Sequence, residues 1–269
     1  TRFGVGFDFA SNEMLFAEMN RIDQDDAQKL AYELISDAEE VSLDERYVAK
    51  SAALYLAAKR LMGRYGSNAL TVECCDSVSM EMEMEHETVP CLALVLLNDQ
   101  GLAASGQADV SGMLTMMVLM YLSGKSVFLG NIGVPSPEES LISLNHSIPT
   151  RKMDGLEAPN LPYSFRPFGV VDWGTAIYVD MMKLKDRVMT VARFDPLVRR
   201  LLVTRGELVK SFPVENWCSQ MIHIKVPDAA GFVHRGHTDY GGHFTVVSGD
   251  YVQELDGLCE MLGVEMELM

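Results

Sequence analysis

The fold class of this 269-residue chain is decided by residues 90–130, PCLALVLLNDQGLAASGQADVSGMLTMMVLMYLSGKSVFLG. Their apolar runs are separated by a polar turn at residues 98–101 and by Gly124. They predict, in order, a helix at residues 90–98, a strand at 102–106, a buried methionine-rich helix at 110–123 and a buried strand at 126–130. Helices and strands that alternate over short connections are typical of βαβ units and a parallel sheet.

The chain before this segment is predicted to be mainly helical. Helices are expected at residues 23–40, which open with a potential capping Asp, and at residues 43–65, which carry an apolar stripe. A short strand is expected at residues 69–74, and the first 20 residues suggest a strand and a linker. In residues 80–88, four glutamates alternate with Met and His, a pattern that a strand and a helix both explain. These glutamates are predicted to form a solvated face.

The character of the sequence changes near Pro135. From there to about Pro162, many Pro, Ser, Asn and Gly residues predict a long connection. Short strands are expected at residues 175–181, 188–194, 201–210, 220–226 and 243–248, and a closing helix at 250–262. Regular short strands suggest a barrel or a curved sheet. We therefore predict an α/β fold, with a parallel-sheet α/β domain at residues 1–162 and a β-rich, barrel-like C-terminal domain at residues 163–269.

The composition excludes several classes of partner. Hydrophobic residues make up 48% of the chain and charged residues 22%, as in a globular protein with a core. The formal net charge of −16 argues against nucleic acid, because phosphate binding needs a surplus of Lys and Arg. It argues equally against an anionic membrane surface. The longest apolar runs are too short to cross a bilayer and no signal segment is recognisable, so we expect a cytoplasmic protein.

The cysteines are Cys74, Cys75, Cys91, Cys218 and Cys259. Because their number is odd and no CxxC pair occurs, we expect reduced, mostly buried thiols rather than a zinc ribbon or a disulfide framework. The adjacent Cys74 and Cys75 could supply a nucleophile, although buried thiols at the end of a strand are usually inert.

A histidine-rich segment precedes the last predicted strand. His234, His237, Asp239 and His243 lie within ten residues, among glycines that would let a loop fold around one centre. Imidazole and carboxylate groups are ligands for divalent transition metals. The segment is therefore a candidate metal site, and a polar surface loop that leads into a strand is the alternative.

Two acidic residues are expected at strand ends. Glu73 lies at the end of the strand at residues 69–74, and Asp109 follows the strand at 102–106. In open parallel sheets, ligands collect beyond the carboxyl ends of the strands. The two carboxylates could share a metal with a histidine and act as acid and base. Asp109 could equally well cap the helix that begins at Val110.

Five modest motifs occur in one order along the chain. They are PCLAL with LND at residues 90–99, AASGQADVSGMLTM with LSGKSVF at 103–128, IPTRKMDG at 148–155, FDPL at 194–197, and GGHF with GDY at 241–251. Together they resemble the L-fucose isomerase family and its relatives, which carry an acidic-Ala-Asp segment, a methionine-rich helix and a turn into a buried strand. The similarity covers nearly the whole chain.

The resemblance implies an α/β domain followed by a barrel-like domain, and an additional N-terminal domain that this chain is expected to lack. It implies a homo-oligomer that interconverts an aldose and a ketose, both small-molecule sugars, through a cis-enediol(ate) with a divalent metal, usually Mn²⁺. The metal would polarise the sugar oxygens while carboxylates move the proton. By position, Asp109 and His243 match the family's metal ligands, and Glu73 is the candidate for the remaining carboxylate. Glu73 and Asp109 would also be the catalytic groups.

The residues expected to contact the sugar are Gln107, Asn145 and His146. Many relatives have Glu in the position of Gln107, and glutamine cannot take up a proton and is a weaker ligand for a hard cation. The Asn145-His146 pair also differs in order from the His-Cys pair of the relatives. Two functions therefore stay open. One is a metal-dependent aldose–ketose isomerase, or its catalytic fragment, and the other is a non-catalytic carbohydrate-binding or regulatory relative.

Overall fold

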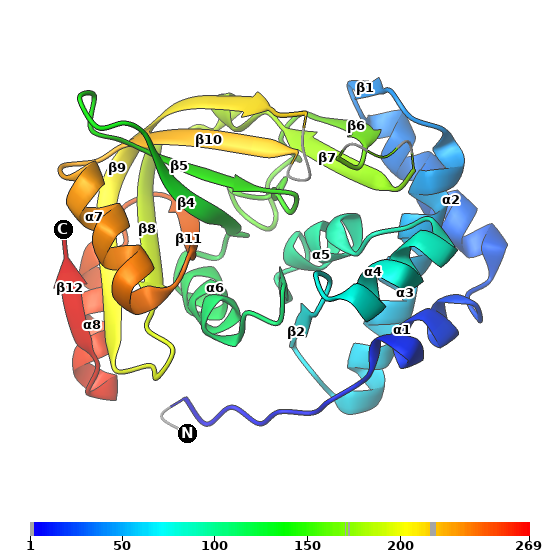
Figure 1. Ribbon diagram of the computed structural model, residues 1–269, viewed down its shortest axis with the longest axis horizontal. Coiled ribbons are helices and arrows are strands. Elements are labelled where there is room, and N and C mark those ends of the chain that lie inside the picture. The colour runs from blue at the N-terminus through cyan, green and yellow to red at the C-terminus, as the bar shows by residue number, and fades with distance from the viewer. Residues whose placement is uncertain (1–2, 170, 172, 216–218) are drawn as a thin grey trace.

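The computed structural model describes residues 3–169, 171, 173–215 and 219–269, so Cys218 lies outside the described residues. The chain forms a helical half, drawn on the right of Figure 1, and a barrel half on the left. No helix in these ranges is both long and apolar enough to span a membrane.

The helical half is built from the first helices and two small sheets. Its helices are α1 (Asn12–Met19), α2 (Gln24–Asp37), α3 (Glu45–Tyr65), α4 (Ser77–His86) and α5 (Cys91–Asn98). Its strands are β1 (Glu40–Val41), β2 (Ala69–Val72), β3 (Ala103–Gly106), β6 (Tyr163–Pro167) and β7 (Thr175–Val179). Strands β2 and β3 pair in parallel, as do β1 and β6, whereas β6 and β7 are antiparallel.

The barrel half consists of one seven-stranded sheet and its covering helices. Its strands are β4 (Phe128–Ser136), β5 (Leu141–His146), β8 (Val188–Phe194), β9 (Arg200–Pro213), β10 (Gln220–Lys225), β11 (His243–Ser248) and β12 (Glu265–Leu268). Its helical segments are α6 (Val110–Ser123), the short turn η1 (Met181–Lys183), α7 (Ala229–Arg235), the π-helical turn η2 (Gly236–Tyr240) and α8 (Val252–Leu262).

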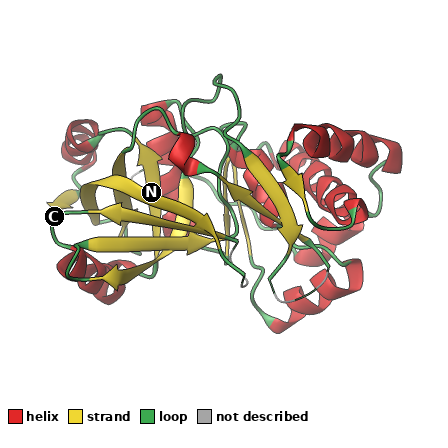
Figure 2. Ribbon diagram, turned by 90° about the horizontal axis from the view of Figure 1, so that it is seen from above, coloured by secondary structure: helices red, strands yellow, loops and turns green. Residues whose placement is uncertain are grey.

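The strand order is β10-β5-β4-β11-β8-β9-β12, and β10 also pairs with β9, which closes the first six strands into a barrel. All pairs are antiparallel except that of β12 with β9. Seen from above in Figure 2, the barrel strands and the helices of the other half lie next to each other. The sheet contains strands from both sides of residue 162.

Helix α6 lies where the two halves meet, since it contacts β2 and β3 on one side and β4, β8 and β11 on the other (Figure 1). It begins at Asp109, whose carboxylate accepts a hydrogen bond from the Gly112 amide at 2.9 Å. It ends at Gly124, which adopts a left-handed φ of 64°. Its methionines Met113, Met116 and Met120 are buried, as predicted. The start of α6 therefore places Asp109 at the boundary between the halves.

The predicted α/β class is confirmed, but the placement of some strands is not as predicted. The strand expected at residues 126–130 belongs to β4, which runs antiparallel between β5 and β11 rather than in a parallel sheet with β2 and β3. The long connection expected at residues 135–162 contains β5, which is hydrogen-bonded on both edges. The first 20 residues contain α1, which Ser11 caps. Local patterns do not determine such pairing, because a short buried strand has the same pattern in a parallel and an antiparallel sheet and because β11, one partner of β4, is distant in sequence.

The ambiguous segment at residues 80–88 is helical as far as His86, where α4 ends. Asp76 caps α4 by accepting a hydrogen bond from the Ser79 amide at 2.8 Å. Because residues four apart lie on one helix face, Ser79 and Glu83 are buried together, whereas Met84 is exposed. The prediction that the glutamates form a solvated face is therefore wrong for Glu83, which is only 7% exposed.

Glu83 should make the protein less stable as pH rises. Burial, with the negative charges of Cys75 and Asp76 added, raises the pKa of Glu83 to about 8 from its ordinary value of 4.5. Between these values the unfolded chain has lost this proton and the folded chain has kept it, so a rise in pH favours unfolding. From about pH 5 to pH 7 this group is expected to cost about 2–3 kcal/mol of the free energy of unfolding.

The measurement is urea unfolding at both pH values for the native protein and for Glu83→Gln. The variant should lose less stability over this interval than the native protein. A Glu85→Gln variant, changed on the exposed side of the same helix, should keep the native pH dependence. Parallel pH profiles for Glu83→Gln and the native protein would contradict the assignment.

Candidate functional site

The candidate site begins at a sharp turn between β3 and α6. Gln107 and Ala108 have φ values of 59° and 49°, a left-handed conformation that costs free energy for any residue with a Cβ. A Cβ at position 112 would lie 2.5 Å from the Asp109 carboxylate, so only glycine allows this cap. The turn therefore fixes Asp109 at the carboxyl end of the β2–β3 sheet.

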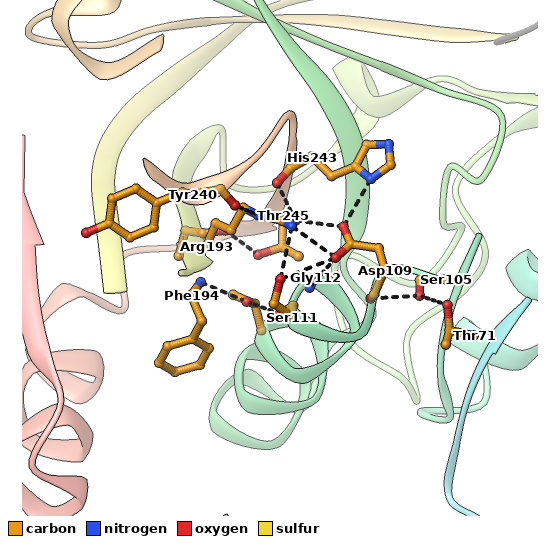
Figure 3. A network of polar contacts seen from close by, with 12 residues as sticks. Thr71, Ser105, Asp109, Ser111, Gly112, Arg193, Phe194, Tyr240, His243 and Thr245 are labelled. Atoms are coloured by element: carbon orange, nitrogen blue, oxygen red, sulfur yellow. Dashed lines mark hydrogen bonds and ion pairs between the residues drawn. The ribbon is translucent and has the colours of Figure 1, made fainter. Parts of the chain in front are cut away.

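Arg193 of β8 holds both oxygens of the Asp109 carboxylate (Figure 3). Its Nη1 donates to Asp109 Oδ2 at 2.7 Å, and its Nη2 donates to Asp109 Oδ1 at 3.0 Å. Nη1 also donates to the His243 carbonyl at 2.7 Å and Nη2 to Ser111 Oγ at 3.0 Å, while Nε donates to the Tyr240 carbonyl. All five N–H groups of the guanidinium are thus used, and the side chain is fixed in place.

His243, the first residue of β11, completes this cluster. Its Nδ1 lies 3.0 Å from Asp109 Oδ2. The side chains of Arg193, Asp109 and His243 are only 7%, 9% and 11% exposed. Burial alone would raise the pKa of the Asp109 carboxyl, but the hydrogen bond from His243 and the ion pair with Arg193 hold it well below its usual range. Asp109 is therefore a permanent anion at the centre of the cluster.

The donors in this arrangement do not fit a divalent metal. Arg193 and His243 occupy both oxygens of Asp109, and a metal ion there would lie beside the positive guanidinium. Among the residues that the structure describes, no group of three or more His, Cys, Asp or Glu side chains could hold a metal ion. The structure thus joins Asp109 and His243, as expected, but through a direct hydrogen bond and with an arginine beside them.

Glu73 and Gln107 lie at the ends of the paired strands β2 and β3, on either side of Cys75. Glu73 Oε1 accepts a hydrogen bond from the Cys75 amide at 2.9 Å, and Gln107 Nε2 donates to Cys75 Sγ at 3.3 Å. Within the described part of the chain, Glu73 forms no hydrogen bond or ion pair with Asp109 or His243. Among the described residues, Glu73, Asp109 and His243 do not form a group of three that could hold a metal ion.

His146 lies against His243, with ring centroids 5.3 Å apart and the rings edge to face. Its Nδ1 accepts a hydrogen bond from the Ser147 amide at 3.0 Å, so its Nε2 carries the proton. This buried Nε2 has no hydrogen-bond partner among the described residues. Burial lowers the pKa of His146 to about 3, so the ring is neutral at neutral pH.

Asn145 and Asn131 extend the site along the barrel. Asn145 pairs with Asn131, which in turn pairs with His243 across the sheet. Asn145 Nδ2 donates to the Gln220 carbonyl at 2.8 Å, while Asn131 is exposed and its Nδ2 donates to the Asn145 carbonyl at 3.2 Å. Asn131 and Asn145 therefore add two neutral hydrogen-bonding amides to the strands beside His243.

The other members of the histidine-rich segment point to different partners. Residues 231–240 form the end of α7 and the turn η2 rather than an open loop. The ring of His237 contacts the Ile132 carbonyl at 3.1 Å. Asp239 pairs with Arg200 at 3.3 Å and also with Arg235. These contacts stabilise the barrel surface and do not gather ligands around His243.

Arg193, Asn131 and Cys75 were missed as neighbours of the site. Arg193 lies in the strand VMTVARF, and a single arginine among buried apolar residues was a usable signal of a buried ion pair. Asn131 gave no such signal, because its position beside His243 depends on strand pairing. Cys75 was interpreted with Cys74 as a mostly buried thiol, whereas the structure exposes it.

A scan against models of protein families and a search of curated proteins each found no match for this chain. The resemblance to L-fucose isomerases therefore stays a prediction.

Proposed function

We propose that this chain binds a small carbohydrate without a divalent metal, as a non-catalytic relative of sugar isomerases. One observation carries the proposal: the guanidinium of Arg193 sits on both oxygens of Asp109, where a metal ion would need them free. A guanidinium supplies a fixed positive charge but has no exchangeable coordination position for sugar oxygens.

The polar groups around His243 suit a polyhydroxylated ligand. The exposed side chains of Gln107 and Asn131 each offer an amide donor and acceptor, and the buried Nε2 of His146 is a donor without an acceptor. Sugar hydroxyl groups donate and accept hydrogen bonds, so a sugar has the chemistry that these amide and imidazole groups require. The strained turn at Gln107 and Ala108 further supports a functional role, since such strain collects at binding sites.

The competing proposal is a metal-dependent aldose–ketose isomerase. The direct contact between Asp109 and His243 favours it, because the two groups lie within reach of one ion. It requires Arg193 to leave the Asp109 carboxylate when the metal binds, at the cost of an ion pair between largely buried side chains. The two proposals therefore differ in what Mn²⁺ should do.

Isothermal calorimetry of metal-stripped protein distinguishes them. We expect no heat of binding with Mn²⁺, and binding of an aldose such as L-fucose that is the same with and without Mn²⁺. Gln107→Ala and Asn131→Ala should each weaken sugar binding about tenfold, the loss expected for one hydrogen bond. An exposed residue away from the site, as in Gln253→Ala, is the matched control and should leave the affinity unchanged.

Tight binding of Mn²⁺ that both Asp109→Asn and His243→Ala abolish would support the isomerase and contradict our proposal. Failure of a panel of aldoses and their alditols to bind, with or without Mn²⁺, would contradict the assignment to carbohydrates.

A further inference from the structure

We propose that Arg21, Arg60 and Arg64 form a binding site for a phosphate dianion, either free or as the end group of a small phosphate monoester. The three arginines gather around one buried carboxylate, that of Glu18, in the helical half. They belong to α1, α3 and the turn after α1, whereas the cluster around Asp109 is built from α6, β8 and β11, so the site does not depend on the proposed function. Three features support it: the number of cations, their exposure and the charge that remains in excess.

The arginines come from neighbouring parts of two helices. Helix α1, which carries Glu18, packs against α3, which carries Arg60 and Arg64 one turn apart (Figure 1). Arg60 Nη1 lies 3.1 Å from Glu18 Oε1, and Arg64 Nη2 lies 2.8 Å from Glu18 Oε2. Arg21, in the turn after α1, places its Nη1 3.5 Å from the same Oε2. One carboxylate thus holds three guanidinium groups close together.

Neutralising Glu18 does not require three arginines. Its side chain is 2% exposed, and a buried carboxylate does need a partner. The buried carboxylates of Asp99 and Asp109, however, each pair with a single arginine. Burial alone would raise the pKa of Glu18, but Arg60 and Arg64 lower it, so this group is an anion at neutral pH. Within the described ranges, the ion pairs of all three arginines go to Glu18, which leaves two positive charges in excess.

The guanidinium groups are open to a ligand although the carboxylate is not. The side chains of Arg21, Arg60 and Arg64 are 68%, 47% and 52% exposed. A guanidinium has five N–H donors in a planar fork, and each of these contacts with Glu18 uses one terminal nitrogen. Donors are therefore left for a second anion.

The excess charge and the planar donors together favour a phosphate group. A phosphate monoester carries a charge of about −1.5 to −2 at neutral pH, so with Glu18 it would balance the three arginines. Phosphate has enough oxygens to accept hydrogen bonds from more than one guanidinium fork, which chloride cannot do. A nucleic acid is a poor candidate, because the net charge of −16 repels a long polyanion. The cluster therefore suits a single phosphate group on a small molecule.

The test is isothermal calorimetry of the whole chain with inorganic phosphate, at an ionic strength kept constant with chloride. We expect saturable binding of one phosphate with a Kd on the order of 1 mM. Arg60→Gln and Arg64→Gln should each weaken this binding about tenfold, the loss expected for one charge-assisted hydrogen bond. The matched control is Arg205→Gln, because Arg205 is 59% exposed but pairs with one carboxylate, that of Asp250. Its affinity for phosphate should equal that of the native protein.

Glu18→Gln separates a phosphate site from an ion-pair network that serves only the fold. Glutamine keeps an oxygen that can accept hydrogen bonds from the arginines, but it removes the negative charge that competes with phosphate. This variant should therefore bind phosphate about fivefold more tightly than the native protein. Equal or weaker binding would contradict the assignment. Far-UV circular dichroism checks that each variant keeps its helices.

O-Phospho-L-serine distinguishes the two sources of the phosphate group. An affinity equal to that of inorganic phosphate would show that the dianion alone is recognised, and a gain of about tenfold or more would show that the site takes an ester. Both results support the inference. The absence of saturable binding with either compound, or affinities that Arg60→Gln and Arg64→Gln leave unchanged, would overturn it. Either of those results would leave the proposal of carbohydrate binding near Asp109 as it stands, since no sugar takes part in this assay.

Discussion

Replacing Arg193 by Leu is expected to cost about 3–5 kcal/mol of the free energy of unfolding, because the Asp109 carboxylate would stay buried without its partner. The ion pair between Asp109 and Arg193 joins the start of α6 to β8. The guanidinium also donates hydrogen bonds to two carbonyl groups of the barrel half, those of Tyr240 and His243. Leucine has no group that could replace these hydrogen bonds. Urea unfolding measured at neutral pH gives the loss directly.

A matched control lies in the same sheet. Arg205 of β9 forms an ion pair with Asp250 at 3.0 Å, but its side chain is 59% exposed. Arg205→Leu should therefore change the free energy of unfolding by at most about 1 kcal/mol. The double variant Asp109→Asn with Arg193→Leu should lose less than the sum of the single variants, since it removes the stranded charge.

A loss below about 1 kcal/mol for Arg193→Leu would mean that water reaches Asp109 easily. The carboxylate would then be open to other ligands, and the metal-dependent proposal would gain support. The stability of this variant therefore also tests the functional assignment.

Elements determined by their own residues could be predicted from the sequence. Helix α6 starts after Asp109 and ends before Gly124, as predicted, because both residues act through local hydrogen bonds and a local backbone conformation. The parallel pair of β2 and β3 also agrees with the prediction from short alternating elements. The prediction that Asp109 caps a helix is confirmed, and its Oδ2 contacts His243 at the same time, so the capping role leaves its role in a site open to test.

Contacts between distant parts of the chain could not be predicted in the same way. Asp109 and Arg193 are 84 residues apart in sequence, and nothing in either segment specifies the other. Strand β4 was assigned to the wrong sheet because a short buried strand has the same pattern in parallel and antiparallel surroundings. Glu83 was placed in solvent because composition alone does not show which face of a helix is covered.

Asp99→Ala is the second variant expected to lose about 3–5 kcal/mol of the free energy of unfolding, because it leaves a buried arginine without its partner. Asp99 follows α5, and its Oδ2 accepts a hydrogen bond from Arg151 Nε at 2.7 Å. Its Oδ1 accepts from Thr150 Oγ1 and from the Arg151 amide, each at 2.9 Å. The two charged side chains are 8% and 5% exposed, and the guanidinium also lies over the ring of Tyr163, 4.7 Å from its centroid.

These contacts tie the segment after β5 to the helical half, so two of the short motifs quoted above, LND and IPTRKMDG, meet at one ion pair. Asp99→Asn is the matched variant, because its amide oxygen can still accept from Thr150 and from the Arg151 amide. Asp99→Asn should lose about half as much of the free energy of unfolding as Asp99→Ala. This half is the loss due to the missing charge, and the other half is the loss due to the missing hydrogen bonds. In urea unfolding, the slope of the free energy of unfolding against urea concentration should be the same for the native protein, Asp99→Ala and Asp99→Asn. A shallower dependence in Asp99→Ala would show instead that the segment after β5 detaches before the rest of the chain unfolds, and Asp99 would then hold one segment rather than the whole fold.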